Sequence, residues 1–252
     1  MRITKTLGVA ATLSLAAALN PASAGPAASP ELNAAATVCF GQAKGTWPEV
    51  IDNCTKVLSV NVTPDAKAGA YYNRGAAYLR TGADQKAVAD FNEAIRLLPR
   101  FGRALQARAS AYIGQKKYEA AIVDLTSAIS IEPTSSVAYN NRGMAHMGKG
   151  DAKSALTDFN KSIELDPKDA ASYAARGSAY LTLGDKTKAL ADLDKSLGMN
   201  PDQVIALFNR GILLVGLGQK EKAVADFQAV LKLAPDNKAA KDQLALLQKS
   251  GG

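Results

Sequence analysis

Small and large apolar residues alternate along the chain in a pattern that returns every 34 residues between Ala68 and Pro235. In each period an alanine is followed four residues later by a phenylalanine or a leucine, so both lie on one face of a helix. A proline closes each period, because it disfavours a helical conformation in the residue before it and has no backbone N–H. These prolines are Pro99, Pro133, Pro167, Pro201 and Pro235. The pattern predicts five helical hairpins in tandem.

Each predicted hairpin sets small residues against large ones. The first helix carries large residues at Tyr71, Leu105, Tyr139, Tyr173 and Leu207, and again at Tyr78, Tyr112, His146, Tyr180 and Leu214. Between these two columns stand Gly75, Ala109, Gly143, Gly177 and Gly211. A glycine ends the first helix in four hairpins, and Lys116 takes that position in the other. Since one such hairpin cannot bury its apolar face alone, neighbouring hairpins must stack.

This arrangement resembles the tetratricopeptide repeat. The aromatic, small, aromatic, alanine, aromatic and proline positions of that family are matched by Tyr173, Gly177, Tyr180, Ala189, Leu193 and Pro201. The resemblance covers most of the chain, in five registers without a gap. It implies an all-α fold, a right-handed α-solenoid of stacked helix-turn-helix repeats, with a concave groove that binds segments of other proteins.

The pattern divides the chain into five parts. Residues 1–24 form a signal peptide, residues 25–30 a linker, and residues 67–235 the five tandem repeats. Residues 31–66 are interpreted as a degenerate N-terminal capping repeat, with helices expected over 31–43 and 47–58 and a connection over 61–66. Residues 236–252 are a C-terminal capping helix, expected over 237–248, and a tail.

The N-terminal segment has the features of a secretory signal. Arg2 and Lys5 precede an apolar run from Leu7 to Leu19, and the small residues of Ala22-Ser23-Ala24 form a cleavage site. The apolar run is short for a membrane span, and no later run is long enough for one. We therefore expect cleavage near Ala24 and a periplasmic or secreted protein without a membrane span. An uncleaved anchor is the alternative.

Two cysteines, Cys39 and Cys54, lie on the two helices of the expected capping repeat. Export permits their oxidation, and an antiparallel helix pair would let the thiols meet, so we expect a disulfide. Two free buried thiols are the alternative. Two cysteines and the single histidine are too few ligands for a zinc site, so no metal or other cofactor is expected.

The most regular charges of the chain are an arginine and an aspartate sixteen residues apart in every hairpin. The arginines are Arg74, Arg108, Arg142, Arg176 and Arg210, and the aspartates are Asp90, Asp124, Asp158, Asp192 and Asp226. The arginines could form a row for anionic ligands. Because an acid accompanies every arginine, we interpret the set as a structural ion-pair ladder between first and second helices.

A column of asparagines precedes alternate arginines, at Asn73, Asn141 and Asn209. The resemblance implies that this column lines the concave groove, where an amide can both donate to and accept from a peptide backbone. The predicted groove residues are Tyr72, Asn73, Arg103, Gln106, Asn140, Asn141, Met144, Phe208 and Asn209, and the same face carries Met147, Ser178 and Ile212. Asparagines that are merely solvated are the alternative.

Composition and charge narrow the function. The chain is 47% hydrophobic and 21% charged, which suits a soluble protein with a real core. Its net charge is +7, but lysines and acids alternate without a basic run, so no nucleic-acid partner is expected. No phosphate-binding loop or nucleophile motif is present, and His146 occupies a column of packed tyrosines.

We therefore expect a non-enzymatic scaffold of the cell envelope that binds a protein or peptide partner. A basic surface binder of anionic envelope polymers is the alternative, and an enzyme a remote one. The pattern identifies neither the partner nor an oligomeric state.

Overall fold

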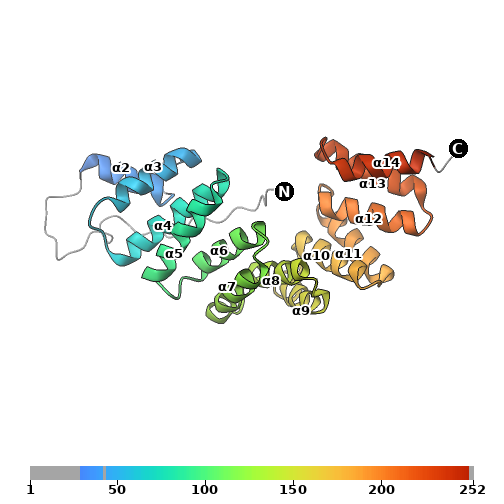
Figure 1. Cartoon of the computed structure of the whole chain (residues 1–252), viewed down its shortest axis with the longest axis horizontal. Coiled ribbons are helices and arrows are strands. Elements are labelled where there is room, and N and C mark those ends of the chain that lie inside the picture. Colours follow the sequence, from blue (N-terminus) through green and yellow to red (C-terminus); the bar gives the residue numbers. More distant parts are fainter. Residues whose placement is uncertain (1–28, 42–43, 250–252) are drawn as a thin grey trace. The chain divides into compact units, whose positions relative to one another are not determined.

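The computed structural model describes residues 29–41 and 44–249, and the expected signal peptide lies outside these residues. The described residues form thirteen α-helices (Figure 1). They are α2 (Pro30–Cys39), α3 (Trp47–Leu58), α4 (Pro64–Arg80), α5 (Asp84–Leu97), α6 (Gly102–Gly114), α7 (Tyr118–Ile131), α8 (Ser136–Lys149), α9 (Ala152–Leu165), α10 (Ala170–Thr182), α11 (Lys186–Met199), α12 (Val204–Gly216), α13 (Lys220–Leu233) and α14 (Lys238–Lys249).

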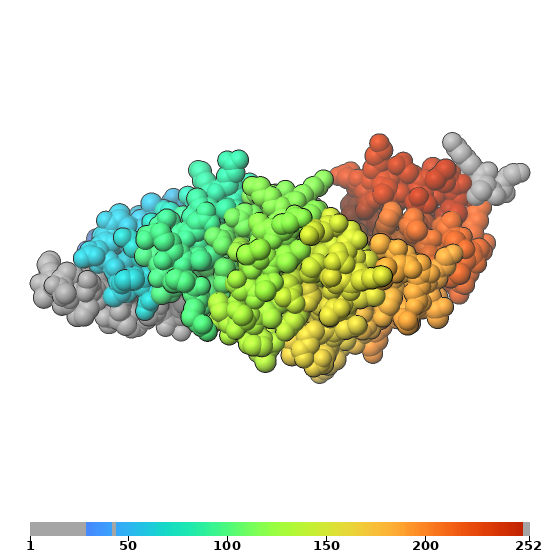
Figure 2. Space-filling view, turned by 60° about the horizontal axis from the view of Figure 1, so that its bottom comes forward, coloured from blue at the N-terminus to red at the C-terminus, as the bar shows by residue number. Residues whose placement is uncertain are grey.

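The chain divides into two compact units between Pro133 and Thr134. The described N-terminal unit holds the hairpins α2/α3, α4/α5 and α6/α7, and the C-terminal unit holds α8/α9, α10/α11, α12/α13 and the single helix α14. Within each unit successive hairpins pack on one another, so that neighbouring colours adjoin in Figure 2. This stacking of helix-turn-helix units confirms the predicted all-α solenoid fold.

Glycines on first helices allow close contact with aromatic rings of second helices. Phe91, Phe159 and Phe227 have no exposed surface. A Cβ atom added at the facing glycine would lie 2.8 Å from a ring carbon of Phe91, 2.6 Å from one of Phe159 and 2.8 Å from one of Phe227. Those distances are shorter than van der Waals contact, so a side chain at the glycine position would push the two helices apart. The alternation of small and large residues in the sequence thus sets the spacing within each hairpin.

The turn inside each repeat hairpin requires a left-handed residue. Gly150, the C-cap of α8, has φ +86°, and equivalent glycines follow α4, α10 and α12. In the turn between α6 and α7, Lys116 adopts φ +60° in place of a glycine. Lys116 is the single non-glycine residue with positive φ in the described part of the chain. A side chain in this conformation is strained, because its Cβ approaches the backbone carbonyl.

The first hairpin departs from the predicted bounds at two points. Helix α2 ends at Cys39, earlier than expected, because the chain turns at Gly41 with φ +72°. Helix α4 begins at Pro64, inside the segment interpreted as a connection, since the Thr63 hydroxyl accepts a hydrogen bond from the amide of Ala66 and caps it. Helix α3 begins where expected and has a capping box formed by Thr46 and Glu49.

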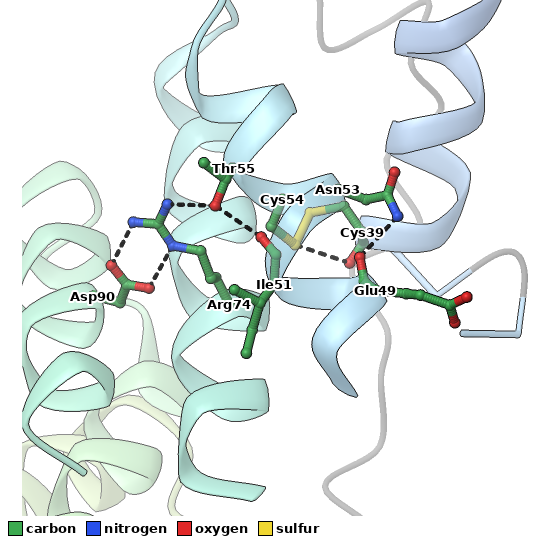
Figure 3. The surroundings of a disulfide bond; sticks show 8 residues. All are labelled: Cys39, Glu49, Ile51, Asn53, Cys54, Thr55, Arg74 and Asp90. Atoms are coloured by element: carbon green, nitrogen blue, oxygen red, sulfur yellow. Dashed lines mark hydrogen bonds and ion pairs between the residues drawn. A yellow bond between two sulfur atoms is a disulfide. The ribbon is translucent and has the colours of Figure 1, made fainter. Parts of the chain in front are cut away.

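A disulfide joins Cys39 of α2 to Cys54 of α3 (Figure 3). Both cysteines are buried, with 1% and 0% of their surface exposed, and they pack among Phe40, Val57 and Val62. The bond therefore lies inside the apolar core of this first hairpin. At the other end of the chain, Ala240 and Leu247 of α14 cover the core of the α12/α13 hairpin.

Candidate functional site

Each arginine of the predicted ladder lies against its own aspartate. Nε and Nη2 of the guanidinium donate to the two carboxylate oxygens over 2.7–2.9 Å in all five hairpins. The aspartates are only 3–7% exposed. Such a bidentate pair fixes the guanidinium plane as well as its position. The hydrogen bonds that each arginine donates to its aspartate raise the pKa of the arginine, against the opposing effect of burial.

In four hairpins, those of Arg74, Arg108, Arg176 and Arg210, the third nitrogen, Nη1, connects the hairpin to the preceding one of the same unit. It donates to the second helix of that hairpin, over 2.7 Å from Arg108 to Asn92, 2.8 Å from Arg176 to Asn160 and 2.7 Å from Arg210 to Asp194. Arg74 reaches Thr55 of α3 over 3.0 Å, which attaches the disulfide-bonded hairpin to the network (Figure 3). The sequence analysis missed these partners, although three of them stand sixteen residues before their arginine.

Tyrosine rings cover several of the arginines. The guanidinium carbon of Arg176 lies 5.6 Å from the ring centroid of Tyr173 and 6.0 Å from that of Tyr180. Corresponding contacts join Arg74 to Tyr71 and Tyr78, Arg108 to Tyr112, and Arg142 to Tyr139. Each of these guanidinium groups is bonded to an aspartate and lies against a tyrosine ring, and those of Arg74, Arg108 and Arg176 also bond to the preceding hairpin. The geometry favours the ladder over a row open to anionic ligands.

In the N-terminal unit, two predicted groove residues are buried. Tyr72 is 4% exposed, with its ring 5.1 Å from that of Phe101, and burial raises its pKa. Asn73 is 6% exposed, and its Nδ2 has no hydrogen-bond partner among the described residues. Neither side chain lines an open groove as expected, because the next hairpin packs over this turn of α4. Arg103 is exposed and Gln106 is half-buried.

In the C-terminal unit, the predicted asparagines join neighbouring first helices. Nδ2 of Asn140 in α8 donates to the Ser172 hydroxyl of α10 over 2.8 Å. Nδ2 of Asn209 in α12 donates to the Ser178 hydroxyl of α10 over 2.6 Å. These bonds hold α8, α10 and α12 in a row. Asn141 is half-buried, and its side chain makes no hydrogen bond to any residue that the structure describes.

A buried network of hydroxyl groups connects α8, α9 and α10 below the surface of this row of first helices. The Ser172 hydroxyl also lies 2.9 Å from that of Ser162 in α9 and donates to the carboxylate of Asp169 over 2.7 Å. Ser162 in turn donates to the carbonyl oxygen of Ser136 over 2.9 Å. Sequence reasoning missed this network, because a buried serine has no periodic signal that separates it from the alanines of the same column.

Helix α12 exposes a stripe of large apolar side chains. Ile205, Ile212 and Val215 are 38%, 37% and 36% exposed, and half-buried Phe208 lies between them. Their spacing of three, four and three residues puts all four on one helix face, next to Asn209. Phe208 is anchored by Phe227, whose ring centroid lies 5.6 Å away. Ile205 and Val215 were not among the predicted groove residues, although the same helical spacing from Phe208 and Ile212 marks them.

The first-helix surface of the C-terminal unit is defined here as this stripe together with Asn140, Asn141 and Met144 of α8 and Ser178 of α10. Met144 packs partly against the core around Phe159. None of these side chains carries a charge. The surface therefore offers apolar anchoring positions beside amide and hydroxyl groups.

Other chemistry has little support in the described residues. Nδ1 of His146 is 3.8 Å from an oxygen of Asp151, and Nε2 is 3.9 Å from one of Asp158, which exceeds hydrogen-bond distance. Over residues 29–41 and 44–249 no three histidine, cysteine or acidic side chains gather as a metal site would need. None of the helices in these ranges combines the length and apolarity of a membrane span.

Stacked helical hairpins with an uncharged first-helix surface define a helical-repeat scaffold for protein–protein interaction. Family models described as tetratricopeptide repeat match residues 68–101, 102–135, 136–169, 159–191 and 177–248. The chain belongs to the tetratricopeptide repeat family, whose members are generally interaction modules rather than enzymes.

Solved structures show the same fold at low sequence identity. A tetratricopeptide repeat protein from Parabacteroides merdae is 24% identical with a TM-score of 0.67, covering 88% of this chain and 86% of its own. The PilF protein of Pseudomonas aeruginosa is 17% identical with a TM-score of 0.70, covering 85% and 97%. YrrB, described as having an unusual peptide-binding site, is 19% identical with a TM-score of 0.56, covering 75% and 96%. No curated protein matches the chain significantly.

Proposed function

We propose that the protein is an adaptor of the cell envelope that binds a segment of a partner protein on the first-helix surface of its C-terminal unit. The observation that carries this proposal is the exposed, uncharged stripe of α12 beside the asparagine and serine row. Contiguous apolar side chains exposed on the surface of a soluble protein often mark a site that binds a partner.

The chemistry of the surface suits a peptide segment with apolar anchors. Side chains of the partner would pack between Ile205, Ile212 and Val215, which contribute burial of apolar area. Asn141, whose amide has no partner among the described residues, can donate to and accept from the partner's backbone. An extended segment and an amphipathic helix both use this combination. The peptide-binding site named for YrrB belongs to that protein and supports the proposal only as a precedent for the fold.

The envelope location is supported by two independent features. The first 24 residues have the charge, apolar run and small residues of a cleavable signal. The chain also contains a buried disulfide, a bond that persists in oxidising compartments and is rare in the cytosol. We infer a periplasmic or secreted mature protein. Fractionation of the producing cells, with N-terminal sequencing of the mature chain, tests this inference, and a full-length cytosolic protein would contradict it.

Partner capture with matched variants tests the binding proposal. The double variant Ile205→Asp, Ile212→Asp places two charges on the stripe without opening the core, since both residues are more than one third exposed. Leu233→Asp is the matched control, because Leu233 of α13 is 40% exposed but lies outside this surface. Tagged proteins are incubated with envelope extract, and the captured proteins are quantified by mass spectrometry.

We expect the parent and the Leu233→Asp variant to capture the same proteins and the stripe variant to lose them by tenfold or more, since two buried anchors contribute at least about 1.4 kcal/mol. Equal capture by all three would contradict the proposal. Capture that survives the stripe variant but disappears between 50 and roughly 300 mM salt would instead favour the binder of anionic polymers.

A further inference from the structure

The α12/α13 hairpin lacks the aromatic cover that the other repeat hairpins give their arginine. In those hairpins at least one tyrosine ring lies 5.6–6.0 Å from the guanidinium carbon. In α12 both tyrosine positions are leucines, Leu207 and Leu214. Arg210 still forms its ladder bonds to Asp226 and Asp194. Its guanidinium plane is therefore held in place, but no tyrosine of its own hairpin covers it.

The preceding hairpin, α10/α11, shows the complete arrangement. The ring of Tyr180 lies 6.0 Å from Arg176 and 5.4 Å from the Lys188 ammonium, so two cations share one ring. Lys188 also forms an ion pair with Asp185 over 2.9 Å. The lysine ammonium thus has two partners, the tyrosine ring and the carboxylate.

Thirty-four residues later the two cations remain, but the tyrosine ring that contacts both of them and the carboxylate that pairs with the lysine are absent. Lys222 replaces Lys188, whereas Leu214 replaces Tyr180 and Gln219 replaces Asp185. The Lys222 ammonium makes no ion pair or ring contact with any residue in the described part of the chain. The hairpin thus has a lysine that has lost both a ring and a carboxylate.

A surface pocket of about 320 Å³ lies at this position, between α11, α12 and α13, whose places in the C-terminal unit are labelled in Figure 1. It is lined by Arg210, Leu214, Gln219 and Lys222, with Leu190 of α11 and Ala225 of α13. Leu214 is 4% exposed, so only a small part of its side chain is open to solvent. This volume lies at the lower end of the range for small-molecule sites, so a single aromatic ring is a ligand of suitable size.

We propose that this pocket binds an aromatic side chain with a carboxylate next to it, presented by a partner protein. The ring would lie near Arg210 and Lys222 as Tyr180 lies near Arg176 and Lys188, held by cation–π attraction and by the apolar surface of Leu190 and Leu214. The carboxylate would pair with Lys222 as Asp185 pairs with Lys188. Asp194 and Asp226 line the same pocket and are bonded to Arg210, so a highly charged anion such as phosphate is disfavoured.

N-acetyl-L-tyrosine, which carries both the ring and the carboxylate, is the probe that tests this proposal. It is titrated into the ¹⁵N-labelled full chain while amide shifts are followed by NMR. We expect saturable shifts at Gln219 and Lys222 with a Kd on the order of 1 mM, as befits a small ligand. N-acetyl-L-tyrosinamide, which lacks the carboxylate, should bind about two- to fivefold more weakly. N-acetyl-L-leucine, which lacks the ring, should give no saturable shift.

Two variants make the test specific to the pocket. Leu214→Tyr supplies the missing ring from within, in a position that Tyr180 occupies in the preceding hairpin, and should abolish binding. Gln219→Asp supplies the missing carboxylate and should remove the preference for N-acetyl-L-tyrosine over its amide. Leu217→Tyr, at an exposed residue outside the pocket, is the control and should bind like the parent. Absence of saturable shifts in the parent, or equal binding by Leu214→Tyr, would overturn the proposal.

This site is separate from the first-helix surface. A negative result for the probe leaves the stripe experiment unaffected, and loss of partner capture by the stripe variant leaves the titration unaffected. The two proposals are therefore tested independently.

Discussion

At the scale of single residues, the arginines of the ladder hold together groups that are distant in sequence. Arg176 donates to Asp192 within its hairpin and to Asn160 of the preceding one. It thereby ties three helices to one side chain. Asp192 is 7% exposed, so removal of the arginine would leave a carboxylate with little access to water. Leaving this buried carboxylate without a partner costs more free energy than the pair contributes when it is intact. The ladder therefore has a structural role.

Arg176→Ala should therefore destabilise the C-terminal unit by about 3 kcal/mol, because a buried partner charge is left uncompensated. Lys195→Ala, at an exposed lysine of α11, should change the free energy of unfolding by less than about 0.5 kcal/mol. Urea denaturation followed by circular dichroism measures both.

The double variant Arg176→Ala, Asp192→Ala separates the pair from its surroundings. Its loss in free energy of unfolding should be clearly smaller than the sum of the losses in the two single variants, since the second change removes the unpaired carboxylate. Additive effects would show that the two side chains do not act as a pair.

At the scale of elements, the turn between α6 and α7 contains a strained residue that the other repeat turns avoid. Lys116 takes φ +60°, a conformation in which a glycine would have no side-chain clash. The sequence identified this turn as the exception, because a lysine interrupts the glycine column. The strain itself becomes visible only in the backbone angle.

Lys116→Gly should stabilise the N-terminal unit by about 0.5–1 kcal/mol, the relief of strain less the entropy that a glycine adds to the unfolded chain. Gly150→Ala, the opposite change in the α8/α9 turn, should destabilise the C-terminal unit by a similar amount. Thermal unfolding of the two variants provides the comparison, and a lower midpoint for Lys116→Gly than for the parent would contradict the strain argument.

The disulfide acts on one hairpin. Replacing Cys39 and Cys54 by serine removes a link that closes a loop with a sequence separation of 15 and should cost about 2–4 kcal/mol locally. Hydrogen exchange should accelerate in α2 and α3, whereas amides of α10 and α11 keep the parent's protection. Equal acceleration in all four helices would show that the bond stabilises more than its own hairpin.

At the scale of the whole molecule, periodicity predicted the fold well because every hairpin solves the same packing problem. The glycine, aromatic and proline columns determine where helices lie and how closely they approach. The arginine–aspartate pairs could be proposed for the same reason, since both members recur with the repeat. The start of α4 at Pro64 was missed because the first hairpin has no proline register to mark its end.

The proposed binding surface was harder to predict than the fold. Tyr72 and Asn73 hold groove positions in the repeat register but are buried, because burial depends on the neighbouring hairpin and not on the column. Ile205 and Val215 were omitted because the sequence alone does not distinguish an exposed apolar residue on a helix from one in the core. The pocket at Arg210 has a signal in the sequence, since α12 replaces both tyrosines of its hairpin by leucine.

Site-specific photo-crosslinking in the producing cells tests the central claim, that a partner protein docks on the first-helix surface. A photoreactive phenylalanine analogue is placed at position 212 of the stripe or, in a matched chain, at position 233 of α13. The account predicts a discrete covalent adduct with one envelope protein from position 212 and none from position 233. Adducts of equal yield from both positions, or none from position 212, would contradict it.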